Sequence, residues 1–157
     1  MIRFRSLLTL VEGGLLLVFF LVGCANDRLE NLTLWGKAFR IRVPNDAVVV
    51  KDPLGDEVII RSGTAFQLRL GPTPIDLPFL KSAIVANRMN RLTRILAESP
   101  EVLIYESQFQ SRKEIHFLGN VKTSKGLVSC KEDETPAAHT EADIQRMWAA
   151  CKTLESL

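Results

Sequence analysis

The alternation of apolar and polar residues in segment 39–71 most strongly limits what this chain can fold into. Phe39, Ile41 and Val43 alternate with Arg40 and Arg42, a two-residue period typical of a β-strand with one buried face. Three further strand segments follow, separated by turns rich in Pro, Gly, Asn and Asp: 48–50, 57–61 and 66–71. The pattern predicts a meander of short antiparallel strands.

After this meander the period changes to that of a helix. Asp76 is a candidate N-cap, Pro78 lies in the first turn, and Ser99-Pro100 would end the helix. The apolar residues of 77–98 have helical spacing: Leu80, Ile84, Val85, Met89, Leu92 and Leu96. We therefore expect a helix over 77–98. Three more strands are expected at 102–106, 114–118 and 127–131, separated by turns at 119–120 and 125–126.

The C-terminal segment predicts a second helix. Thr140-Glu141-Ala142-Asp143 resembles a capping box, with Asp in place of the usual Glu. One apolar stripe runs along the helix: Ile144, Met147, Trp148, Cys151 and Leu154. The order of strands, helix, strands and helix predicts a single α+β domain whose antiparallel sheet is covered by the two helices.

The N-terminal segment has the composition of an export signal. Arg3 and Arg5 precede the unbroken apolar block 15–22, which matches the charged and apolar regions of a signal peptide. The alternative is an uncleaved membrane helix. The apolar region 7–23 is at the short edge of the about 17–25 residues needed to cross a bilayer, and Glu12 interrupts it, so we favour export.

The end of this block, Leu21-Val22-Gly23-Cys24, resembles the lipobox of bacterial lipoproteins. The resemblance implies that Cys24 carries lipid, such as palmitate, after cleavage before it, although a plain signal peptide with a chance cysteine is the alternative. Residues 1–23 are then the signal peptide, 24–33 a polar tether and 34–157 the domain. In a Gram-negative bacterium, Ala25 would favour the outer membrane, with the domain facing the periplasm.

The charge balance and the two remaining cysteines exclude several classes of function. The chain has 20 Lys and Arg against 18 Asp and Glu, a net charge of +2. Removing 1–23 takes away two Arg and one Glu and leaves +1, which does not indicate a nucleic-acid partner. In an exported chain, Cys130 and Cys151 predict a disulfide, with two buried free thiols as the alternative. They lack the ligand spacing of a metal site with His116 and His139.

The first expected helix carries Lys81, Arg88, Arg91 and Arg94, and no acidic residue precedes Glu98. Such a face could bind anionic lipid headgroups, lipopolysaccharide or an acidic partner. At 100° per residue, Lys81 and Arg88 lie close together whereas the last two cations wind away. This spacing favours an ordinary solvated face.

Few other residues indicate chemistry. His116 and Glu114 share a strand face and could relay a proton or hold a metal, but a solvated cross-strand pair is more common. Trp35 and Tyr105 could line a ligand cleft. The acidic loop 132–134 lacks a calcium-binding pattern, and the chain contains no recognisable catalytic or phosphate-binding motif. We expect no cofactor, no metal and no enzymatic activity.

The element order, the lipobox and the first strand "FRIRVP" of residues 39–44 resemble the DcrB/PsbP-like group of small domains. This resemblance implies a non-enzymatic binder or assembly factor, and no functional residue carries over. We therefore expect a lipid-anchored accessory protein that engages another envelope protein through a sheet face or the cleft between sheet and helix. The alternatives are an immunity lipoprotein that neutralises a periplasm-delivered toxin and a small envelope hydrolase.

Overall fold

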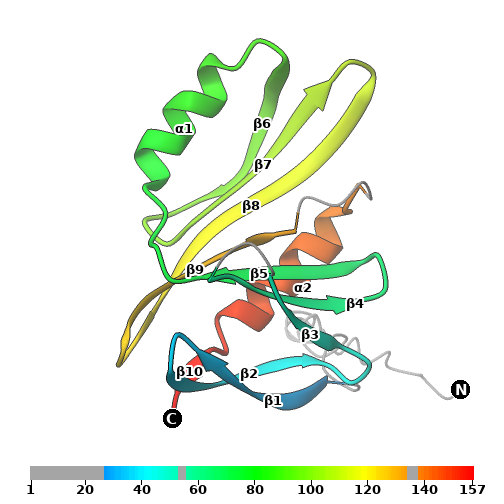
Figure 1. The fold of residues 1–157 in the computed structure, drawn as a ribbon. Coiled ribbons are helices and arrows are strands. Elements are labelled where there is room, and N and C mark those ends of the chain that lie inside the picture. Colours follow the sequence, from blue (N-terminus) through cyan, green and yellow to red (C-terminus); the bar gives the residue numbers. More distant parts are fainter. Residues whose placement is uncertain (1–26, 53–55, 134–137) are drawn as a thin grey trace, which may run out of the picture.

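The α+β class expected from the sequence is confirmed, and most of the fold is β-sheet (Figure 1). The computed structural model describes residues 27–52, 56–133 and 138–157, so the signal peptide 1–23 and the lipidation residue Cys24 lie outside the described residues. The strands are β1 (Asp27–Leu34), β2 (Lys37–Pro44), β3 (Val48–Lys51), β4 (Val58–Ser62), β5 (Phe66–Gly71), β6 (Asn90–Glu98), β7 (Val102–Phe109), β8 (Arg112–Thr123), β9 (Gly126–Glu132) and β10 (Glu155–Ser156). The helices are α1 (Leu77–Ala86) and α2 (Glu141–Cys151).

The strands form two sheets in which every pairing is antiparallel. The small sheet has the order β1-β2-β10, and the seven-stranded sheet has the order β3-β4-β5-β9-β8-β7-β6. Figure 1 shows β6, β7 and the far half of β8 rising away from the rest of the large sheet, with α1 beside them. The expected strands within 39–71 are confirmed, with ends that differ by at most two residues.

Helix α2 packs against both sheets, touching β2 of the small sheet and β5, β8 and β9 of the large one. Its capping box is present as expected, because Thr140 Oγ1 accepts from the Asp143 N–H and the Asp143 carboxylate accepts from the Thr140 N–H. The core consists of fully buried side chains from β1, β2, β4, β5, β7, β8, β9 and α2, and its large members include Leu34, Phe39, Ile41, Ile60, Phe66, Ile104, Phe117, Ile144 and Met147. The predicted apolar stripe of α2 is therefore confirmed.

The predicted cysteine pair is also confirmed. Cys130 on β9 and Cys151 at the end of α2 form a disulfide, with their Cα atoms 6.6 Å apart. Both residues are fully buried in the core. The bridge therefore fixes the end of α2 to the centre of the large sheet.

The predicted helix over 77–98 is wrong in its second half. Helix α1 ends at Ala86, and residues 90–98 form strand β6 at the edge of the large sheet. The Asn87 side chain ends the helix, because its Oδ1 accepts from the backbone N–H groups of Met89 and Asn90. Two register shifts then break the alternation of β6, and an interrupted two-residue period imitates helical spacing.

The predicted turn at 119–120 is also wrong, since both residues lie within β8. A Cβ on Gly119 would lie 2.7 Å from Cζ3 of Trp148. Glycine occupies this strand position because the indole of α2 packs directly on its backbone. The Asn120 side chain exchanges two hydrogen bonds with the backbone of Ile75 and so positions the segment that leads into α1.

Residues 27–33, expected to belong to the tether, form most of β1. This strand pairs along its full length with β2, from Asp27 opposite Pro44 to Leu34 opposite Lys37. Only Leu32 and Leu34 are buried in it, so its polar first half gave no strand signal. The folded domain therefore includes residue 27 instead of starting at 34.

We predict that Gly119→Ala lowers the free energy of unfolding by about 1–3 kcal/mol, because the new methyl group overlaps the indole of Trp148. Urea unfolding measures the change. The control is the pair Gly119→Ala/Trp148→Phe, in which the shorter ring leaves room for the methyl group. If Gly119→Ala lowers the free energy of unfolding by the same amount in the natural chain and in the Trp148→Phe chain, the indole is not what requires glycine at this position.

Candidate functional site

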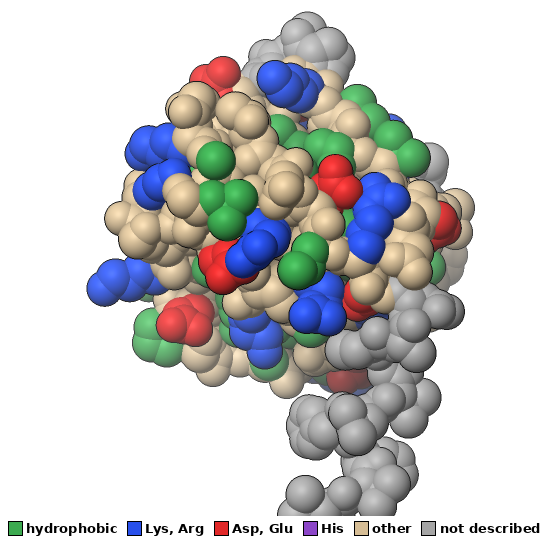
Figure 2. Space-filling view, turned by 90° about the horizontal axis from the view of Figure 1, so that it is seen from below, with side chains coloured by type: hydrophobic (Ala, Val, Ile, Leu, Met, Phe, Trp, Pro, Cys, Tyr) green, Lys and Arg blue, Asp and Glu red, His purple; other side chains and the backbone are tan. Residues whose placement is uncertain are grey.

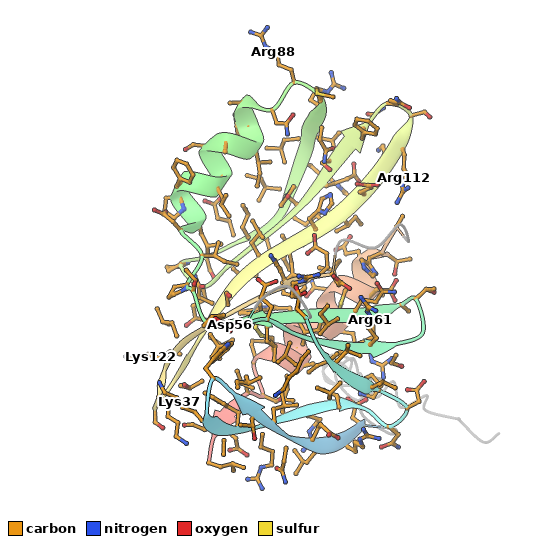
Figure 3. All side chains as sticks on the ribbon, viewed as in Figure 1. Lys37, Asp56, Arg61, Arg88, Arg112 and Lys122 are labelled. Atoms are coloured by element: carbon orange, nitrogen blue, oxygen red, sulfur yellow. A yellow bond between two sulfur atoms is a disulfide. The ribbon has the colours of Figure 1, made fainter. Side chains whose placement is uncertain are left out.

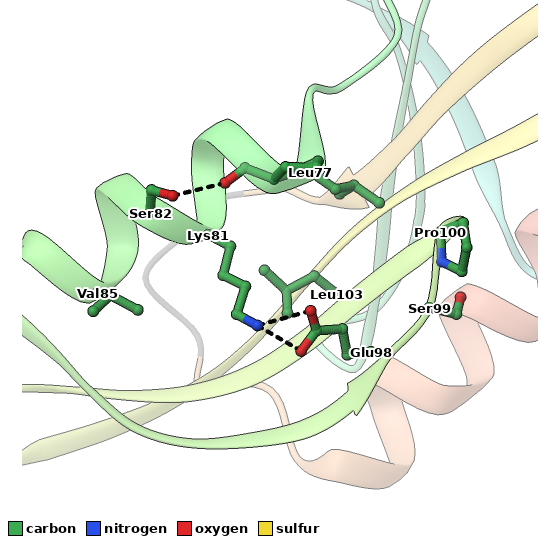
Figure 4. Close-up of a pocket in the computed structure, with 9 residues that line it drawn as sticks. Leu77, Lys81, Ser82, Val85, Glu98, Ser99, Pro100 and Leu103 are labelled. Atoms are coloured by element: carbon green, nitrogen blue, oxygen red, sulfur yellow. Dashed lines mark hydrogen bonds and ion pairs between the residues drawn. The ribbon is translucent and has the colours of Figure 1, made fainter.

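The described residues line a cleft between α1, the end of β6 and the start of β7 (Figure 4). Its volume of about 960 Å³ is at the upper end of the range for ligand sites. The lining is mostly apolar and comes from α1, β6, β7 and the turn between the two strands: Leu77, Pro78, Lys81, Ser82, Val85, Glu98, Ser99, Pro100 and Leu103. We call this hollow the α1 cleft.

Helix α1 lies along the cleft and is mostly apolar, but little of it is buried. Asp76 caps the helix by accepting from the Phe79 N–H at 3.0 Å, as the sequence predicted. Leu77 is the only residue of α1 that is buried. Phe79 and Val85 remain 67% and 60% exposed, which is unusual for large apolar residues on a ten-residue helix. Helix α1 thus presents apolar surface that the rest of the domain leaves uncovered.

One ion pair crosses the α1 cleft. Figure 4 shows the Lys81 ammonium group reaching from α1 to the Glu98 carboxylate at the end of β6, 2.8 Å from both oxygens. Both side chains are more than a third exposed, so the pair contributes little to stability. Its position gives a mostly apolar cleft one charged donor and one charged acceptor that could orient a bound group.

The placement of all four cations on one helix is wrong. Lys81 lies on α1, Arg88 in the following turn, and Arg91 and Arg94 on β6. Arg94 lies 3.5 Å from a Glu106 carboxylate oxygen and is therefore partly neutralised. Helix α1 ends at Ala86 instead of residue 98, so Arg91 and Arg94 lie on strand β6 and not on the helix.

His116 has closer partners than Glu114, the one expected. Its Nε2 lies 3.7 Å from Glu114, but Nε2 is only 3.0 Å from Ser107 Oγ and Nδ1 is 2.8 Å from Glu132 Oε1. The imidazole also packs on the ring of Tyr105, with the centroids 5.0 Å apart. A chain of Ser, His and Glu side chains thus crosses β7, β8 and β9.

This chain has the order of groups found in acyl-transfer triads, but its setting is structural. Ser107 is 1% exposed, so its hydroxyl group is closed to a substrate in this conformation. The second oxygen of Glu132 accepts from the Phe117 N–H at 2.8 Å. Glu132 therefore joins β9 to β8 beyond their last backbone pairing, Leu118 with Lys131. No local sequence signal indicated this partnership, because the three residues come from different strands.

The described residues of the acidic loop expected at 132–134 are Glu132 and Asp133, and both pair with basic side chains. Glu132 ends β9, and the Asp133 side chain is 3% exposed. Asp133 accepts from Arg61 at 2.6 Å and from Arg69 at 2.5 Å, and Arg69 also contacts Glu57 at 2.7 Å. Among the residues that the structure describes, no group of three or more His, Cys, Asp and Glu residues is arranged to hold a metal ion.

These contacts change the acidity of Asp133. Burial raises the pKa of its carboxyl group, but the hydrogen bonds and positive charges of Arg69 and Arg61 together outweigh burial, so the pKa lies below its ordinary value of 3.8. The folded state therefore favours the charged form of Asp133. Its contribution to stability is present above pH 4 and is lost as the pH falls toward the lowered pKa.

Trp35 lies in the turn between β1 and β2 and packs edge-on against Phe39, with ring centroids 6.2 Å apart. It lines a second, smaller hollow of about 300 Å³ together with Pro72, Pro74 and Leu127. Trp35 therefore does line a hollow, whereas Tyr105 packs on His116 instead.

None of the helices in the described ranges is both long and apolar enough to cross a membrane.

The chain matches no protein-family model, no curated protein and no solved structure. The resemblance to the DcrB/PsbP-like group therefore stays a hypothesis based on element order and the first strand. The geometry of the α1 cleft is accordingly the main guide to function.

We predict that Asp133→Asn lowers the free energy of unfolding by about 3 kcal/mol at pH 7, because it removes the charge that pairs with two arginines. Urea unfolding between pH 3 and 7 should also show that the variant loses less stability in acid than the natural chain. The control is Asp56→Asn, which changes an exposed carboxylate. Equal acid sensitivity of Asp133→Asn and the natural chain would contradict the assignment.

Proposed function

We propose that this chain is a lipid-anchored bacterial envelope protein that works by binding another envelope protein through the α1 cleft. The single observation that carries the binding role is the apolar helix α1, which the domain leaves exposed along the cleft. The anchor rests on the resemblance of residues 21–24 to a lipobox. On this proposal the domain faces the periplasm or the cell surface, and in a Gram-negative bacterium it is attached to the outer membrane.

A protein partner suits this surface better than a small ligand. Small-ligand pockets bury most of the ligand in a concave site. Here the apolar surface continues beyond the cleft lining onto Phe79, which is 67% exposed. An apolar segment of a partner could fill the cleft and cover Phe79 at the same time, with Lys81 and Glu98 at the rim pairing with its polar groups.

Binding is also favoured over catalysis. The serine and histidine that contact each other, Ser107 and His116, are not part of the cleft lining. The two serines in the lining are Ser82 and Ser99, and the hydroxyl of Ser82 donates to the Pro78 carbonyl within α1. A hydrolase that used Ser107 and His116 would therefore need a conformation that exposes Ser107.

We predict that Val85→Asp lowers capture of the partner from envelope extract by about tenfold or more, because a carboxylate would be buried without a partner in the complex. The matched control is Val48→Asp on β3, since Val48 and Val85 are each 60% exposed. Quantitative mass spectrometry of proteins bound to the immobilised chain gives the ratio.

A partner retained equally by both variants would contradict binding in the α1 cleft. A secreted toxin captured by the natural chain and lost in Val85→Asp would support the cleft and favour the immunity alternative. Turnover of a cell-wall substrate without any stoichiometric partner would instead favour a hydrolase.

We predict that Cys24→Ser leaves the protein soluble or as an unprocessed precursor, because serine offers no thiol for lipid attachment. Labelling cells with palmitate and separating membrane from soluble fractions measures the change. Palmitate-labelled, membrane-bound protein in this variant at the natural level would contradict the anchor.

A further inference from the structure

Two protruding turns meet at one end of the large sheet, away from the small sheet (Figure 1). They are the α1–β6 turn with the first residues of β6, residues 87–91, and the β7–β8 hairpin, residues 108–113. The pairing of β6 with β7 holds them side by side, since Asn90 lies opposite Phe109 and Arg91 opposite Gln108. We call these two segments together the tip.

The tip is basic. Its eleven residues include four cations and no Asp or Glu: Arg88, Arg91, Arg112 and Lys113. Arg112 and Lys113 lie 2.8 Å and 3.2 Å from carboxylates outside the tip. Among the described residues, neither Arg88 nor Arg91 belongs to an ion pair, and both are exposed. Figure 3 shows Arg88 extending outward at this end of the molecule.

The tip also exposes apolar side chains between these cations. Met89 is 76% exposed, the highest value among the large exposed apolar residues, and Phe109 is 41% exposed. The face at the opposite end of the molecule differs in its charge. Figure 2 shows basic and acidic side chains interspersed there, where pairs such as Arg40 with Glu155 neutralise one another.

We propose that the tip docks on an anionic phospholipid surface. Arg88 and Arg91 contact the headgroup phosphates, and Met89 and Phe109 enter the boundary between headgroups and acyl chains. The charge of the tip complements such a surface, and its two turns protrude, so they suit a broad surface rather than a ligand held in a hollow. None of the tip residues lines the α1 cleft.

This interaction goes beyond the proposed function, because it adds a second membrane contact that is separate from the α1 cleft. Two apolar side chains and two unpaired cations form a small contact, whereas a standard protein interface takes about 800 Å² from each partner. A small contact suits a chain that a lipid anchor already holds near a membrane, because a second weak membrane contact strengthens the binding that the anchor provides. The tip would then fix the orientation of the domain on the bilayer.

The test places the photo-crosslinking amino acid p-benzoylphenylalanine at Phe109 in the full chain. The chain is reconstituted with an excess of vesicles made either of phosphatidylcholine alone or of phosphatidylcholine and phosphatidylglycerol. We expect lipid adducts from position 109 in the anionic vesicles, with a yield that falls as salt is added. The matched position is Leu127 in the β8–β9 hairpin, which is 45% exposed and should give few adducts.

Charge variants complete the test. Arg88→Gln/Arg91→Gln should lower the adduct yield at position 109 about tenfold, because each cation near an anionic surface strengthens binding. The control Lys37→Gln/Lys122→Gln removes the same charge at the other end of the molecule (Figure 3) and should leave the yield unchanged. Equal yields in both kinds of vesicle, equal losses in both charge variants, or adducts with a protein instead of lipid in native membranes would overturn the proposal.

Failure of the anchor can be distinguished from failure of the tip. If the natural chain does not float with the phosphatidylcholine vesicles, the proposed anchor is wrong. Crosslinking at position 109 to added anionic vesicles then still tests the tip directly.

Discussion

The burial of one face of α2 between the two sheets is the interaction on which the rest of the structure depends. Ile144, Met147 and Cys151 are fully buried, and α2 contacts β2 of the small sheet as well as three strands of the large one. The disulfide to Cys130 ties the end of this helix to β9. The chain then returns as β10, which pairs with β2.

The two helices therefore have different roles. Helix α2 buries five residues in the core, whereas α1 buries one and leaves large apolar side chains in solvent. Because the core is complete without most of α1, this helix and the turn after it are available for interactions outside the domain. The α1 cleft and the tip both follow from this difference, and so does the proposal that the protein works by binding.

The sequence predicts those parts of the fold in which one face is buried without interruption. The alternation at 39–43 and the stripe of α2 gave correct elements, and the position of Cys151 on that stripe supported its pairing with Cys130. Prediction failed where local patterns mislead. The two bulges of β6 imitate a helix, the glycine at 119 lies in a strand because of a distant indole, and the partnership of His116 with Glu132 depends on strand pairing across the sheet.

Helix α2 holds the domain together, whereas α1 is buried only at its first residue, Leu77. Native-state hydrogen exchange of the full chain, followed by mass spectrometry, tests this difference most directly, because amide protection reports the free energy of local opening. We expect the amides of α2, β8 and β9 to exchange only through global unfolding and those of the second half of α1 to exchange far faster. Protection of α1 equal to that of α2 would contradict the account.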